Sequence, residues 1–191
     1  MNGPARIEYG ASRQASKAIV LLNNFDYRHG DPVAVERGWT RIGTPVGVDL
    51  EGRRVEFRRH ANYEVVQPLA MAGFMRAASV TDCYFDVSDG ESDTQVLEFA
   101  TDIAALSTIA AGAGLSVAMV DLVDGAGTVV RRVVPQPVTA RYSRNDKIID
   151  DIYLPEYFRA TFSSFLAMAR THAPWRKLVS HCRIARGPTV P

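Results

Sequence analysis

The chain has 191 residues, of which 47% are hydrophobic, and a net charge of +1. This composition excludes a disordered, collagen-like or coiled-coil protein, and the length is sufficient for one sizeable core. No apolar run approaches the roughly 20 residues that a membrane helix needs, and the N-terminus lacks the apolar core of a signal peptide. The two cysteines, Cys83 and Cys182, are too few for a disulfide framework. We therefore expect a cytoplasmic protein that makes no membrane contact.

The small net charge conceals a strong segregation along the chain. Residues 1–80 carry a charge of +3, residues 81–130 carry −9 and residues 131–191 carry +7. The basic last third could face an acidic partner, a nucleic acid or the acidic middle of the same chain. We expect the last arrangement, because folded domains often interleave charges of both signs.

The first half of the chain favours strands. The apolar run 18–25 predicts a buried strand that ends in turn-forming residues. Glycines and an Asp-Pro pair predict a loop over 26–38, with a helical turn over 32–37 as the alternative. The segment 39–50 looks extended, and Glu51-Gly52 predicts a turn.

The segment Arg53 to His60 alternates as a half-buried strand does. Val55 and Phe57 fall on one side, while the other side carries Arg54, Glu56, Arg58 and His60. Further strands are predicted over 63–69 and 75–87. This pattern indicates a sheet with one face in the core and one face outside.

The second half favours helices around one hairpin. Val96, Phe99, Ile103, Leu106 and Ile109 are spaced by three and four, which predicts a helix from Asp93. The glycine corner 112–114 ends this helix and is followed by strands over 115–123 and 128–134 with a turn at 124–127.

Leu154-Pro155 opens a second helix, because proline is well tolerated at the first helical position. Phe158, Phe162 and Phe165 line one face of that helix. The predicted fold class is α+β: antiparallel strands with one long helix packed across them and a helical C-terminus. We divide the chain into an α+β recognition domain, 1–150, and a helical C-terminal segment, 151–191.

Two metal sites can be considered and neither is expected. Seven carboxylates in residues 82–102 are dense enough for Mg²⁺ or Ca²⁺, but they lack the spacing of an EF-hand and fit a solvated strand face and a helix cap. Zinc would need ligands from scattered histidines and cysteines, and no CxxC or HExxH motif is present. The sequence therefore predicts no metal and no cofactor. A cysteine nucleophile at Cys83 with a distant histidine has only the residue types in its favour.

Two basic segments are candidates for chemistry with nucleic acids. Arg54 and Arg58 lie about 7 Å apart on the polar side of their strand, a spacing that could follow a phosphate backbone. Arg176 and His181 are five residues apart in a segment that can be helical. A histidine beside a fixed arginine can act as acid or base in RNA cleavage while the arginine holds the phosphate. These residues make a nucleic-acid-binding module and a small metal-independent ribonuclease the two alternatives.

The order of elements in the second half resembles a known family. The helix with Phe99-Ala100 and Leu106-Ser107, its glycine corner, and the hairpin with an Asp-Gly-x-Gly turn are similar to the amino-terminal domains of bacterial HEPN-containing proteins. Leu154-Pro155-Glu156-Tyr157-Phe158 resembles the junction into the helical part of those proteins. The resemblance covers about residues 80–170.

The resemblance implies a role in anti-phage defence or abortive infection. In such proteins the N-terminal domain is thought to sense and the helical domain to cleave RNA. HEPN nucleases are four-helix units with an Arg-x4–6-His motif, whereas only 37 residues follow Leu154 here. Arg176 and His181 thus match the motif without its scaffold. We expect a non-catalytic sensor domain that either stands alone or is a truncated gene product, with residues 151–191 as the remainder of an effector domain. We expect it to associate with an effector domain or a second copy through its C-terminal helix.

Overall fold

A computed structural model describes residues 5–9, 14–23, 32–35, 38–41, 46–60, 79–111, 115–135, 149 and 153–171. The expected strand over 63–69, the glycine corner 112–114, Arg176 and His181 lie outside these residues. Within the described ranges, no helix is long and apolar enough to cross a membrane.

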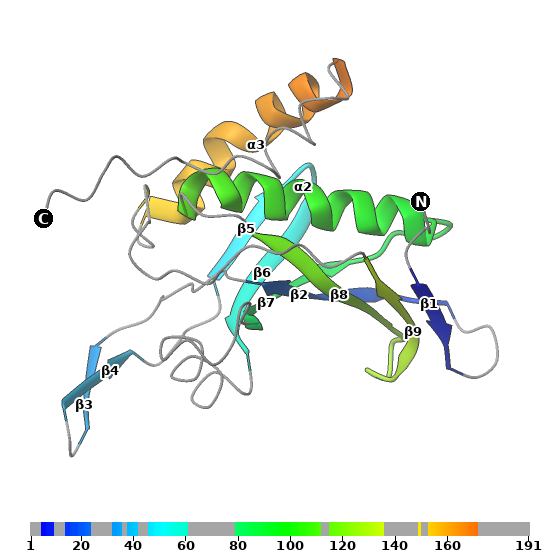
Figure 1. Ribbon diagram of the computed structural model, residues 1–191, viewed down its shortest axis with the longest axis horizontal. Helices are drawn as coiled ribbons and strands as arrows, with labels where there is room; N and C mark the ends of the chain where they lie inside the picture. Colours follow the sequence, from blue (N-terminus) through cyan, green and yellow to red (C-terminus); the bar gives the residue numbers. More distant parts are fainter. Residues whose placement is uncertain are drawn as a thin grey trace, which may run out of the picture.

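The described chain is built around a seven-stranded antiparallel sheet in the order β1-β9-β8-β2-β7-β6-β5 (Figure 1). The strands are β1 (Ala5–Glu8), β2 (Lys17–Asn23), β5 (Val46–Leu50), β6 (Arg53–Arg59), β7 (Ser79–Asp86), β8 (Ser116–Val123) and β9 (Val129–Val134). A separate two-stranded hairpin joins β3 (Pro32–Val35) to β4 (Gly38–Arg41). With α2 (Asp93–Ala111) and α3 (Leu154–Thr171), the fold is α+β, as predicted.

The β3–β4 hairpin corrects the prediction for residues 26–38. The sequence predicted a loop there, with a helical turn as the alternative, but Val33 pairs with Thr40 and Val35 with Gly38. Two β-branched valines flanking one alanine favour an extended chain. Only residues 36–37 separate the two strands, so the turn signals mark the ends of a short hairpin.

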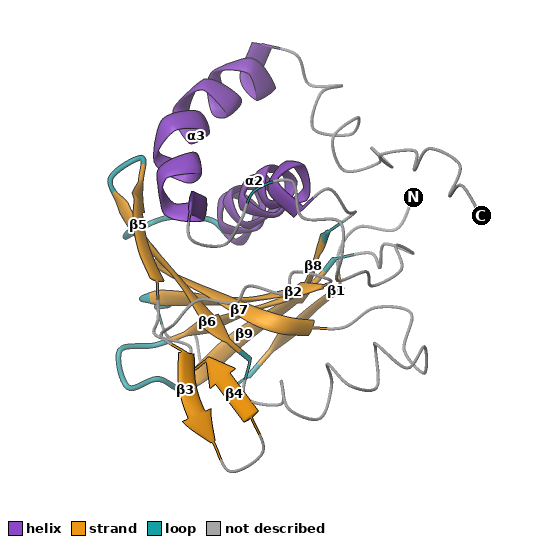
Figure 2. Cartoon of the chain, turned by 90° about the vertical axis from the view of Figure 1, so that its left-hand side faces the viewer, coloured by secondary structure: helices purple, strands orange, loops and turns teal. Residues whose placement is uncertain are grey.

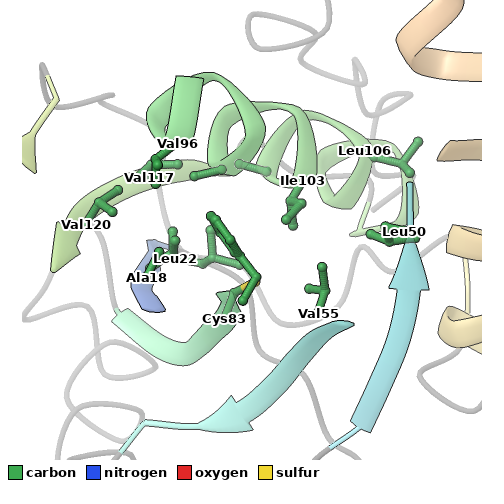
Figure 3. Packing of buried hydrophobic residues seen from close by; sticks show 14 of the residues in the cluster. Ala18, Leu22, Leu50, Val55, Cys83, Val96, Ile103, Leu106, Val117 and Val120 are labelled. Atoms are coloured by element: carbon green, nitrogen blue, oxygen red, sulfur yellow. The ribbon is translucent and has the colours of Figure 1, made fainter. Parts of the chain in front are cut away.

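Both helices lie on the same side of the sheet (Figure 2). Helix α2 contacts β2, β8 and α3, and α3 contacts β5. Figure 3 shows how the core is filled beneath α2: Ile103 points from the helix toward the sheet, where Leu22, Cys83 and Val55 lie. We call this side of the sheet the helix face and the opposite side the outer face.

Helix α2 begins with a reciprocal cap. The Gln95 N–H donates to Ser92 Oγ at 3.3 Å, and the Ser92 N–H donates to Gln95 Oε1 at 2.9 Å. This capping box satisfies two of the amide groups that a helix N-terminus leaves open. Val96, Ile103 and Leu106 are buried as the spacing predicted, whereas Ile109 is 37% exposed. Two successive steps of three residues turn Ile109 about 120° away from Ile103, which carries it off the buried stripe.

The phenylalanines of α3 are buried inside the molecule. Phe158 and Phe162 are 0% and 1% exposed, and the Phe158 ring stacks on Phe57 of β6 with centroids 5.2 Å apart. Phe162 meets Phe99 of α2 edge to face at 5.7 Å. The apolar face that the spacing of these residues predicted is therefore covered by the chain itself. These rings fill the space between α3, the sheet and α2. Association through the C-terminal helix stays a prediction.

Candidate functional site

The outer face of β6 and β7 carries a continuous group of polar side chains. Alternation places Val55 and Phe57 of β6 in the core, so their neighbours along the strand project to the other side. The outer face of these two strands carries Arg54, Glu56, Arg58, His60, Asp82, Tyr84 and Asp86. The prediction that Arg54 and Arg58 share the polar side is confirmed. The predicted spacing of about 7 Å was wrong, because the four residue steps between them in an extended strand span about 13 Å.

A histidine–aspartate pair lies on this surface, where β6 ends. His60 Nδ1 is 2.9 Å from Asp82 Oδ1 and 3.0 Å from Oδ2, so one ring nitrogen faces the whole carboxylate. The Tyr84 hydroxyl donates to Oδ2 at 3.5 Å. The side chain of Asp82 is only 9% exposed, against 22% for His60. The pair therefore connects the end of β6 to the middle of β7 at a position that is largely shielded from solvent.

Burial governs the titration of Asp82. Removal from water disfavours the charged carboxylate and raises the pKa of Asp82 above its ordinary value, although the hydrogen bond and the charge of His60 act in the opposite direction. The pKa of Tyr84 is also raised, first by burial and then by the nearby Asp82. With Nδ1 of His60 facing the carboxylate, Nε2 is the ring nitrogen left to hydrogen-bond a ligand.

The two arginines of the outer face are held by neighbouring groups. The Arg58 guanidinium lies 4.5 Å from the centre of the Tyr84 ring and donates to Glu56 Oε2, with the Nε contact at 3.0 Å. Arg54 Nη1 donates to Asp49 Oδ2 at 3.3 Å. Both side chains stay open to solvent, at 45% exposed for Arg58 and 59% for Arg54. The stacked Arg58 is the better fixed of the two, because its planar group contacts both a ring and a carboxylate.

The predicted dense acidic block is dispersed in the fold. Glu91 pairs with Arg53 at 2.6 Å, Asp93 with Arg131 at 3.1 Å, and Asp121 with Arg132 at 2.6 Å. Among the described residues, no three His, Cys, Asp or Glu side chains come together as a metal site would require. Two of these pairs use Arg131 and Arg132, so the acidic middle does neutralise part of the basic last third, as the charge pattern predicted.

Cys83 belongs to the core. It is 0% exposed and projects to the helix face, while its neighbours Asp82 and Tyr84 project to the outer face. Burial raises the pKa of the thiol far above its usual range, and the charge of Asp82 acts in the same direction. A thiol that stays protonated and dry cannot serve as a nucleophile, so the structure contradicts the cysteine-nucleophile alternative.

The alternation of residues predicted that His60 and Asp82 lie on polar strand faces, but it did not predict the contact between their side chains. Their contact depends on the register of β6 against β7, in which Arg58 lies opposite Asp82. Eighteen residues, 61–78, separate the described ends of β6 and β7, and no local pattern determines the register across such a connection. The only signal in the sequence was that both residues occupied outward positions in predicted strands.

Comparison of the chain with family models, with curated proteins and with solved structures finds no match. The resemblance to HEPN-associated domains therefore stays a prediction.

Proposed function

We propose that this chain is a non-catalytic cytoplasmic recognition domain of a HEPN-type anti-phage system and that it binds its ligand on the outer face of β6 and β7. The observation that carries the proposal is the fixed, solvent-accessible group of Arg58, Tyr84 and His60. Each of these side chains is oriented by a neighbour, so a ligand would meet a preformed surface and pay little ordering entropy. The resemblance itself rests on residues of α2, of the β8–β9 hairpin and of the start of α3.

Nucleic acid is the ligand that the outer face favours. Arg54 and Arg58 lie four residues apart on one strand, a distance of about 13 Å along the strand axis, and this span is comparable to about two phosphates of an extended single strand. Tyr84 of β7, the strand between β6 and β2, supplies an aromatic ring next to Arg58. Guanidinium groups and aromatic rings are the groups with which sheet surfaces bind single strands. Because Glu56 and Asp49 already neutralise the two arginines, binding has to exchange these ion pairs for phosphate contacts.

Fluorescence anisotropy with a fluorescein-labelled single-stranded RNA of mixed sequence tests this proposal. Two phosphate contacts contribute about 1.4 to the slope of log K against log salt for a single strand. The Arg54→Ala/Arg58→Ala variant should bind more weakly and lose that part of the slope. Arg159→Ala is the matched control, since Arg159 is 58% exposed on α3 and also faces one carboxylate, Glu156. Equal binding by the double variant and the wild type would refute nucleic-acid recognition by this surface.

The same RNA distinguishes recognition from cleavage. The proposal predicts that the RNA stays intact on a denaturing gel after long incubation with the protein. Cleavage that disappears in His181→Ala would establish the ribonuclease alternative that uses Arg176 and His181. Cleavage that disappears in His60→Ala would instead assign catalysis to the histidine–aspartate pair. Either result overturns the non-catalytic assignment.

A further inference from the structure

Strand β1 forms one edge of the seven-stranded sheet. Among the described strands its only partner is β9, beside which it lies at the right-hand end of the sheet in Figure 1. Residues 6–9 are all exposed, with Ile7 at 44% and Tyr9 at 43%. A strand in this position presents a row of main-chain donors and acceptors to solvent and can be extended by another strand.

The register identifies which main-chain groups are open. Ile7 lies opposite Arg132, and the Tyr9 N–H donates to the Val130 carbonyl at 2.9 Å. In an antiparallel pair the bonded positions alternate, so Ile7 and Tyr9 turn their main-chain groups toward β9. Arg6 and Glu8 consequently turn theirs toward the open edge.

The sequence of β1 is complementary to itself when two copies run antiparallel. With Ile7 opposite Ile7 of a second copy, Arg6 lies opposite Glu8 and Glu8 opposite Arg6. These are the positions whose N–H and C=O groups face the open edge, so each opposed pair can exchange two main-chain hydrogen bonds. The same register places opposite charges directly across from each other twice, which is the favourable arrangement for cross-strand pairs.

The charges of this edge differ from those that keep strands apart. Protective edges carry lysines or other like charges that repel a second copy. Here one strand carries both signs two residues apart, and within the described ranges Glu8 has no ion-pair partner. Arg6 donates one long hydrogen bond, to Thr94 Oγ1 at 3.3 Å. Both charged groups are therefore available to a neighbouring chain.

We propose that β1 is a self-association edge through which two copies of this chain join their sheets, with Ile7 on the two-fold axis. The interface is isologous, since the same strand is presented by both partners. A strand of four residues buries less surface than a stable dimer needs. Association is therefore weak, reversible and concentration-dependent.

Sedimentation equilibrium from micromolar to millimolar concentration tests the proposal with charge exchanges. Wild type should show a mass that rises toward that of a dimer, while Arg6→Glu and Glu8→Arg each place like charges opposite each other twice and should remain monomeric. The double variant Arg6→Glu/Glu8→Arg restores both pairs with reversed sign and should associate like wild type. A wild type that stays monomeric, single variants that associate as it does, or a double variant without rescue would overturn the proposal. Circular dichroism verifies that each variant is folded.

Disulfide trapping tests the register itself, independently of the charges. In a Cys182→Ser background, Ile7→Cys places two cysteines at a non-bonded pair with Cα atoms about 4.5 Å apart, which is within disulfide range. Tyr9→Cys is the matched control, because Tyr9 is exposed directly after β1, on the same side as Ile7, but would lie about 14 Å from its copy. Rapid oxidation of Ile7→Cys to a covalent dimer, with little from Tyr9→Cys, supports the register. Equal oxidation of both variants contradicts it.

Discussion

Replacing Phe158 by alanine tests whether α3 is part of the same core as the sheet. Phe158 is fully buried, stacks on Phe57 at 5.2 Å and lies 5.8 Å from the Tyr157 ring. Burying a phenylalanine side chain is worth about 1.5–3 kcal/mol, and the cavity left behind brings the cost of Phe→Ala to about 3–5 kcal/mol. For a domain of this size, each kcal/mol lowers Tm by about 2–4 °C. We therefore expect Phe158→Ala to melt roughly 10 °C below wild type.

Urea and thermal unfolding followed by circular dichroism measure this change. Tyr153→Ala is the control, because Tyr153 lies just before α3 and is 64% exposed; its cost should be within about 0.5 kcal/mol. The double variant Phe57→Ala/Phe158→Ala should cost less than the sum of the two single variants, since the stacked pair is lost only once. A loss below about 1 kcal/mol for Phe158→Ala would refute the packing of α3 on β6.

Three further predictions concern a titrating group, a helix cap and a turn. Burial raises the pKa of Asp82 above its ordinary value of 3.8, so the folded chain holds the carboxyl proton of Asp82 more tightly than the unfolded chain does. The contribution of Asp82 to the free energy of unfolding therefore falls as the pH rises from the ordinary carboxyl pKa through the raised one. Asp82→Asn should therefore gain stability relative to wild type as the pH rises above the carboxyl range and lose this advantage at acid pH, in urea titrations at a series of pH values; a difference independent of pH would contradict the burial argument. Ser92→Ala should lose about 1 kcal/mol in urea unfolding, because it removes the N-cap of α2, and an unchanged midpoint would show that the cap is dispensable. Gly52→Ala should cost about 1–2 kcal/mol, because Gly52 has φ of +77° although its added Cβ would meet nothing within 4 Å; Gly125→Ala, which is equally open and is not in the left-handed region, should cost less, and equal losses would exclude the backbone explanation.

Local patterns in the sequence predicted most of the helices and strands that the structure contains. The spacing of apolar residues predicted a helix from Asp93, and α2 runs to Ala111. The turn at Glu51-Gly52 was also predicted, and positive φ at both residues matches the two-residue turn that suits a hairpin. These features depend on neighbouring residues, so the sequence alone is enough to identify them.

The arrangement of these elements depends on distant residues and was not predictable. Strand β2 lies between β7 and β8, and β1 pairs with β9 more than 100 residues away. The spacing of Phe158 and Phe162 indicated an apolar face but could not show what covers it, and the answer is Phe57 and Phe99 from two other elements. The contact of His60 with Asp82 was not predictable either, because it depends on the register of β6 against β7.

Chemical-shift mapping tests the proposed binding surface most directly. The backbone amide resonances of the ¹⁵N-labelled chain would be followed while the single-stranded RNA is added. We predict that the largest changes fall on β6 and β7, around Arg58, His60 and Tyr84, and that α3 is unaffected. Changes concentrated on α3, or no changes at RNA concentrations that saturate the anisotropy signal, would contradict recognition by the outer face.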